Sequence, residues 1–102
     1  MQNLPQLQVL QSIQAVEHPS IAASLFDLGM LSDLHVADDL NVSCTLVLPF
    51  EGIPANMTAY LKNSLAAAAQ QAGGKLTEVR LALMDAPAVE RFLALETQNW
   101  RG

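Results

Sequence analysis

The sequence has little of what several classes of protein require. It contains a single cysteine, Cys44, so one chain can form neither an intrachain disulfide nor an all-cysteine metal cage. Aromatic residues make up only 5% of its 102 residues, which is too sparse for a base-stacking platform. No apolar run approaches the length of a membrane span, and the first residues lack the basic region of a signal peptide. We therefore expect a cytoplasmic protein that does not enter a membrane.

Positive charge is also scarce and unevenly placed. Five Lys and Arg residues stand against ten Asp and Glu, which gives a net charge of −5. No Lys or Arg precedes Lys62, whereas six acidic residues do, so the first 61 residues carry −6 and the remainder +1. Binding to nucleic acid or to an anionic membrane needs a basic face, which this chain lacks. An acidic half is suited to a solvated surface, a basic partner or a cation.

The residues that are present predict one small domain with six elements. The chain is 51% hydrophobic with a mean hydropathy of +0.25, enough for one thin core at 11.0 kDa. Hydrophobic periodicity and turn residues predict the order α-β-β-α-β-α. The elements are a helix over 4–17, strands over 31–37 and 41–48, a helix from Pro54 to Gly73-Gly74, a strand over 75–84 and a helix capped by Asp85. We expect an α+β two-layer sandwich, with a small mixed three-stranded sheet and helices on one face.

The same periodicity assigns side chains to faces. Asn3 is a plausible N-cap of the first helix. Its expected apolar stripe is Leu4, Leu7, Leu10, Ile13 and Val16. On the third strand, the expected apolar face is Thr77, Val79, Leu81 and Leu83.

The residues that could carry chemistry are few. Cys44 alternates in phase with Val42 and Leu46, so we expect it in the core, without a base to activate it. The two histidines, His18 and His35, are too far apart for a short metal-ligand spacing, and we expect His35 to face solvent. No phosphate loop, zinc motif or nucleophile elbow is present. We therefore expect a protein that is not an enzyme.

One segment resembles a known family. His18-Pro19-Ser20 and Phe26-Asp27-Leu28-Gly29-Met30-Leu31, followed by a hairpin and a Pro-initiated helix, are similar to the small iron–sulfur cluster assembly domain of SufT, PaaD and the N-terminus of Mrp/ApbC-type ATPases. This family is also called domain of unknown function fifty-nine. The resemblance implies such a domain over 1–85, with 86–102 as its C-terminal helix and tail. Gly29 tolerates a positive φ at the turn into the strand, and Asp27 could bond the turn's amides or reach into a site.

The chain departs from the family pattern at two positions. His18-Pro19 stands where members usually have Asp-Pro. Ile53-Pro54 stands where many carry Cys-Pro at the entrance to the second helix, and Cys44 does not match that position. The thiolate that the resemblance implies for a cluster is therefore missing. His18, Asp27 and Glu51 are the candidate oxygen and nitrogen ligands for Fe(II) or another divalent ion.

Three interpretations follow from these residues. The first is a non-enzymatic adaptor in iron–sulfur cluster assembly or metalloprotein maturation, which contacts an iron–sulfur carrier, an Mrp/ApbC-type ATPase or a client protein. Its expected contact surfaces are the acidic first half and the tail that carries Phe92 and Trp100. The second is a metal-binding module that uses His18, Asp27 and Glu51. The third is an auxiliary subunit of a phenylacetate-degradation-type complex. An open edge of the sheet also makes a homodimer possible.

Overall fold

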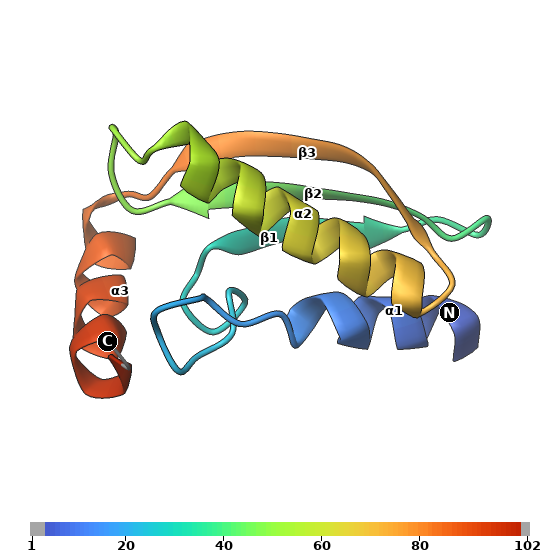
Figure 1. Ribbon diagram of the computed structural model, residues 1–102, viewed down its shortest axis with the longest axis horizontal. Coiled ribbons are helices and arrows are strands. Elements are labelled where there is room, and N and C mark those ends of the chain that lie inside the picture. Colours follow the sequence, from blue (N-terminus) through green and yellow to red (C-terminus); the bar gives the residue numbers. More distant parts are fainter. Residues whose placement is uncertain (1–3, 101–102) are drawn as a thin grey trace.

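The computed structural model describes residues 4–100 and has the expected order of elements (Figure 1). These are α1 (Leu4–Gln14), β1 (Leu31–Val36), β2 (Asn41–Leu48), α2 (Ala55–Gln71), β3 (Lys75–Leu83) and α3 (Ala86–Asn99). The first helix ends at Gln14, three residues earlier than the sequence pattern predicts. The predicted N-cap Asn3 lies outside the described residues.

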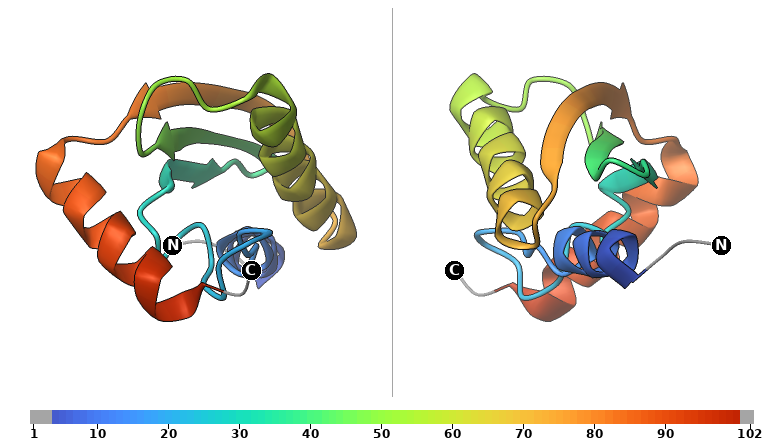
Figure 2. Two further views of the ribbon diagram at one scale, coloured as in Figure 1. Left: turned by 60° about the vertical axis from the view of Figure 1, so that its left-hand side comes forward. Right: turned by 90° about the vertical axis from the view of Figure 1, so that its right-hand side faces the viewer.

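The sheet is mixed and has the order β1-β2-β3. β1 pairs antiparallel with β2, and β2 pairs parallel with β3. α1 and α2 contact each other and lie on the same face, α1 against β1 and α2 against β3 (Figure 2). The α+β two-layer sandwich predicted from the sequence is therefore confirmed.

Local sequence explains where the elements begin and end. The turn after β1 has Leu40 at φ 68°, and Asn41 N–H donates to the Asp39 carboxylate, which is the chemistry of a tight hairpin. Pro54 precedes the first residue of α2 and sets its entry. Asp85 caps α3, because its Oδ1 accepts a hydrogen bond of 2.9 Å from Ala88 N–H.

The buried stripe of α1 differs from the predicted one. Gln6, Val9 and Ile13 are buried, whereas Leu4 and Leu7 are exposed. Gln6 is tolerated inside because its Nε2 donates to Val36 O at 3.1 Å and to the carboxylate of Asp38 at 3.3 Å. The predicted stripe is therefore right for Ile13, and for Leu10 and Val16, which pack against the core, and wrong for Leu4 and Leu7.

An irregularity near the start of β3 also shifts one predicted face. The pairing passes from Val42–Leu76 to Ser43–Glu78, which leaves Thr77 as an extra residue. Thr77 is exposed and its hydroxyl donates to Val42 O at 3.1 Å. Leu76, rather than Thr77, therefore continues the helix-facing side of the strand.

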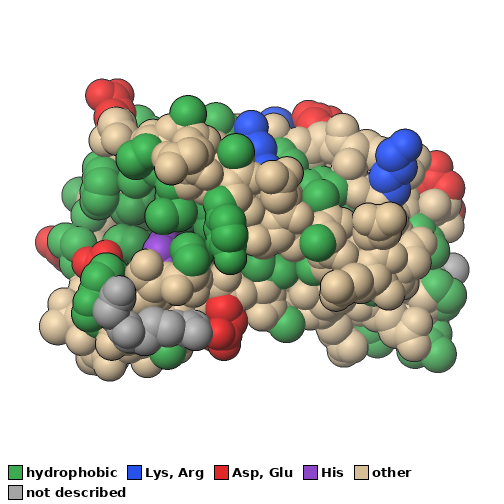
Figure 3. Space-filling view, viewed as in Figure 1, with side chains coloured by type: hydrophobic (Ala, Val, Ile, Leu, Met, Phe, Trp, Pro, Cys, Tyr) green, Lys and Arg blue, Asp and Glu red, His purple; other side chains and the backbone are tan. Residues whose placement is uncertain are grey.

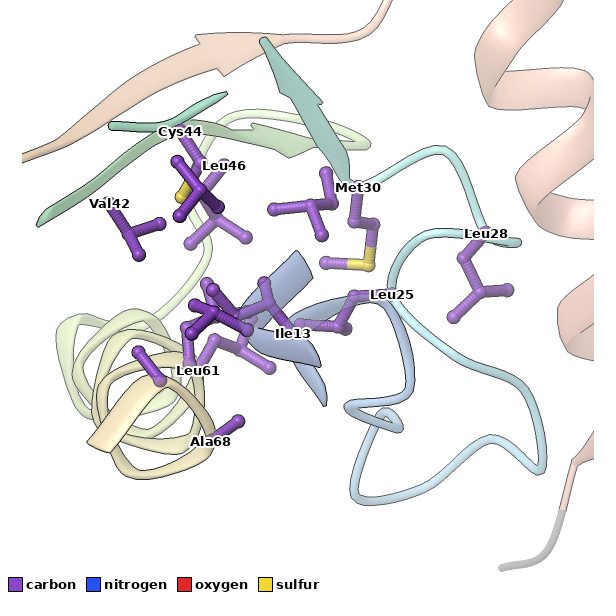
Figure 4. Close-up of a cluster of buried hydrophobic side chains, with 14 of the residues drawn as sticks. Ile13, Leu25, Leu28, Met30, Val42, Cys44, Leu46, Leu61 and Ala68 are labelled. Carbon is purple, nitrogen blue, oxygen red and sulfur yellow. The ribbon is translucent and has the colours of Figure 1, made fainter. Parts of the chain in front are cut away.

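The core lies between the sheet and the two helices (Figure 4). Val42, Cys44 and Leu46 point from β2 toward the helices, as the alternation predicts. Leu61 and Ala68 of α2 meet them from the other layer. Cys44 is 0% exposed, so its interpretation as a core residue is confirmed.

α3 stands apart from the sheet and runs back along the segment that joins α1 to β1 (Figure 2). Ala22 N–H donates to Asn99 O at 2.8 Å, and Ile21 forms an isolated β-bridge with Trp100. The C-terminal helix is therefore docked on its own domain. Within residues 4–100, none of the helices has the length and apolar character needed to cross a membrane.

Candidate functional site

A small apolar pocket opens where α2 begins and α3 passes. It has a volume of about 140 Å³ and is lined by parts of the chain that lie far apart in sequence. We call it the α2-entrance pocket; its lining comprises His18, Met30, Glu96, Phe92 and apolar residues between 48 and 61. Figure 3 shows a histidine within a hollow surrounded by hydrophobic side chains at this end of the molecule.

The pocket fits a side chain better than a cofactor. Small-molecule sites in proteins usually have volumes of about 300–1,000 Å³, more than twice that of this pocket. Its lining is apolar except for His18 and Glu96. On its rim, Phe50 is 53% exposed in the loop that leads into α2. A protruding aromatic beside an apolar hollow is typical of a protein contact surface.

His18 is the one predicted site residue that lines this pocket. The ring Nδ1 of His18 accepts a hydrogen bond of 3.0 Å from Ser20 N–H, and the backbone N–H of His18 donates to Ala23 O at 3.1 Å. Because the Nδ1 lone pair is used in this bond, the neutral ring carries its proton on Nε2. The same bond holds the ring in place and occupies the nitrogen that would otherwise ligate a metal.

The Asp27-Leu28-Gly29-Met30 segment forms a structural turn. Gly29 has a φ of 78°, as the sequence predicts, and its N–H donates to Phe26 O. Leu28 and Met30, on either side of the glycine, are both buried at 2% exposure. Ser24 Oγ accepts from Asp27 N–H at 3.0 Å, so a serine hydroxyl, and not the Asp27 carboxylate, bonds this turn's backbone. The Asp27 side chain is exposed and does not line the pocket.

The three candidate metal ligands lie in different settings. His18 is half-buried in the pocket, while Asp27 and Glu51 are exposed on two separate loops. Among residues 4–100, no group of three His, Cys, Asp or Glu side chains is placed to hold a metal ion. His35 is exposed on β1, as expected. The mixed-ligand hypothesis therefore stays a prediction without an assembled ligand set.

An iron–sulfur cluster does not fit the residues at the α2 entrance. The position next to Pro54 carries the apolar side chain of Ile53, which lines the pocket. The thiol of Cys44 lies inside the sheet–helix core, and burial raises its pKa, with a smaller opposing effect of Arg80. Cluster ligation requires thiolates, and neither site supplies one.

We predict that Cys44 reacts slowly with iodoacetamide in the native protein. The thiolate is the reactive form, and both burial and the raised pKa reduce it at neutral pH. Mass spectrometry should show labelling at the rate of unfolding, and rapid labelling in denaturant. Fast stoichiometric labelling of the folded chain would show instead that the thiol is accessible.

Sequence patterns missed part of this site. Phe92 was expected in a contact surface, but it is 3% exposed and packs inside, where it lines the pocket. Trp100 is exposed, as a contact residue would be. Phe50 was not predicted as a site residue. The sequence signal that could have identified it is its position as an aromatic residue in the loop between Pro49 and Gly52.

Comparison with solved structures finds the same fold in another protein. The crystal structure of a Domain of Unknown Function DUF59 from Bacillus anthracis matches with a TM-score of 0.53 and 18% sequence identity. The match covers 85% of this chain and 82% of that one. No protein-family model matches the sequence, and no curated protein matches it. The fold implied by the sequence resemblance is therefore confirmed, and the SufT/PaaD-like assignment stays a prediction.

Proposed function

We propose that this protein is a non-enzymatic accessory factor in iron–sulfur cluster assembly or metalloprotein maturation that acts by protein–protein contact. The observation that carries the proposal is the α2-entrance pocket, which has apolar residues where the family pattern has Cys-Pro. The similarity to a DUF59 structure supports the fold on which the family argument depends. The sequence resemblance supplies the link to iron–sulfur assembly.

Contact is favoured over ligation because of what surrounds Ile53. Phe50 projects beside it, Met57 forms part of the same lining, and the pocket between them has room for an inserted apolar side chain. Burying such groups against a partner removes apolar surface from water, which drives association. The exposed carboxylates of Asp27 and Glu51 belong to the acidic first 61 residues of the chain. Their negative charge suits a partner whose contact surface has a basic rim.

Affinity capture tests the proposal. Tagged wild-type protein should recover an iron–sulfur carrier, an Mrp/ApbC-type ATPase or a client protein, quantified by mass spectrometry. Phe50→Asp should lower this recovery about tenfold or more, as expected for a central interface aromatic. Leu4→Asp is the matched control, because it introduces the same charge at an exposed leucine on the far end of α1.

Two results of the capture would contradict the proposal. Recovery of an oxygenase or hydroxylase, without any assembly protein, would favour an auxiliary subunit of a metabolic complex. Equal loss in Phe50→Asp and Leu4→Asp would show that the α2-entrance pocket does not make the contact.

We further predict that anaerobically purified protein holds no stoichiometric metal and shows no visible charge-transfer band, before or after incubation with iron and sulfide. The physical reason is that the only thiol is buried in the core. The metal-module alternative predicts that Fe(II), Zn(II) or Mn(II) raises the melting temperature and that His18→Ala removes the gain. A metal-dependent rise in melting temperature that His18→Ala removes would show that the protein acts by binding a metal ion and not by protein–protein contact.

A further inference from the structure

The outer edge of β3 carries an uncovered apolar surface. β3 is an edge strand, and the side chains of Leu81 and Leu83 are 52% and 51% exposed although their partners in β2 belong to the core-facing side. Tyr60, on the α2 helix that packs against β3, is also half exposed. We call these three residues the β3-edge surface. Long, apolar edge strands with an open backbone are sites of association.

The other edge of the sheet is protected. β1 has six residues, and its pairing is interrupted between Ser32 and His35, where Asp33 adopts a φ of 51°. Such a bulge disrupts the ladder of outward-facing backbone groups. In β3 the irregularity is confined to the start, and the pairing from Glu78 to Leu83 is regular. β3 therefore offers a regular edge from Glu78 to Leu83, whereas the interruption in β1 falls near the middle of a six-residue strand.

The backbone of β3 presents a defined set of groups to this edge. Met84 N–H, just after the strand, donates inward to Leu48 O at 2.9 Å. Since successive residues of a strand alternate between its two edges, the N–H groups of Leu83, Leu81 and Val79 point outward. Val79 is therefore able to exchange a pair of hydrogen bonds with the same residue of another strand that runs antiparallel.

The charges on the open face of the sheet select the partner. Arg80 Nη1 donates to Glu78 Oε2 at 2.8 Å, and both side chains stay about half exposed. Arg80 is held in place because its Nε donates to Thr45 Oγ1, which in turn donates to Asp33. An antiparallel pairing centred on Val79 sets Glu78 opposite Arg80 of the other strand, twice. The strand is thus complementary to a second copy of itself.

We propose that β3 pairs antiparallel with β3 of a second copy, about a two-fold axis at Val79, to form one continuous sheet across a dimer. The pairing joins the outward backbone groups of the two Val79 residues, adds two cross-strand ion pairs, and brings the exposed side chain of Leu81 beside the other strand. The assembly stops at a dimer, because both copies use the same β3 edge and the β1 edge, which is interrupted, does not add a further copy.

Sedimentation equilibrium over a wide range of protein concentration tests the proposal. Wild-type protein should show a reversible monomer–dimer equilibrium. Arg80→Glu should weaken dimerisation about tenfold, because two favourable cross-strand pairs become two like-charge pairs. The double variant Glu78→Arg/Arg80→Glu should restore it, since it exchanges the charges without losing their complementarity. Arg91→Glu, at an exposed position of α3, is the control with the same change of net charge.

A second variant tests the pairing of the edge strands without changing the Glu78–Arg80 ion pairs. Leu81→Lys should also weaken the dimer, because a lysine on an edge strand opposes pairing, while circular dichroism should show the monomer still folded. A strict monomer at high concentration would overturn the proposal, as would a dimer that neither Arg80→Glu nor Leu81→Lys weakens. A wild-type monomer that binds an extended peptide along β3 would assign the edge to another partner and overturn it too.

Discussion

Phe92→Ala should lower the free energy of unfolding by about 3–5 kcal/mol, the usual cost of removing a buried aromatic ring. Phe92 is the one buried residue of α3, and it lines the α2-entrance pocket. Small domains have about 5–15 kcal/mol of stability in total, so the loss is a large part of it. Because α3 contacts the rest of the domain through few residues, its docking against Ala22 and Ile21 should weaken as well.

The neighbouring residue provides the control. Leu93 is 45% exposed on the same helix, and Leu93→Ala should cost less than about 1 kcal/mol. Urea unfolding followed by circular dichroism measures both variants under the same conditions. Equal effects would show that α3 does not pack through Phe92 as described.

Leu28→Ala should lower the free energy of unfolding by about 2–5 kcal/mol, the usual cost of truncating a buried leucine. Leu28 is 2% exposed and, in Figure 4, lies on the side of α3, apart from the side chains beneath the sheet. Removing it leaves a cavity between the turn at Gly29 and the elements around it. Chemical denaturation gives the loss directly.

The adjacent Asp27 makes the comparison informative. Asp27 is exposed, and Asp27→Ala should change stability by no more than about 0.5 kcal/mol. Such a result would show that the Asp27-Leu28-Gly29-Met30 segment contributes to stability through its buried side chains and its positive-φ glycine. If Asp27→Ala were the more damaging variant, or if it abolished a metal-dependent gain in melting temperature, the Asp27 carboxylate itself would stabilise the fold or bind metal.

The sequence predicted the order and type of the elements because their signals are local. The alternation around Cys44, the proline before α2 and the cap at Asp85 each act within a few residues. The burial of Gln6 could not be predicted in this way, since its partners lie 30 and 32 residues away. The extra residue at Thr77 likewise depends on the register with β2.

The candidate site was less predictable for the same reason. The α2-entrance pocket joins His18, the loop with Phe50, and Phe92 of α3, which no local pattern connects. The comparison of Ile53-Pro54 with a family Cys-Pro pair indicated the entrance to the second helix, and both residues line the pocket there. It could not show that an apolar hollow, and not a set of ligands, surrounds that position.

We propose that this chain supports iron–sulfur protein maturation through contact at the α2-entrance pocket. The most direct test measures the activity of an iron–sulfur-dependent enzyme in cells that lack the gene, with an iron-independent enzyme as the reference. Wild-type protein and Cys44→Ala should both restore the activity, whereas Phe50→Asp, expressed at the same level, should not. Restoration by Phe50→Asp together with failure of stably expressed Cys44→Ala would contradict a role through contact at this pocket, and so would full iron–sulfur activity in cells without the gene.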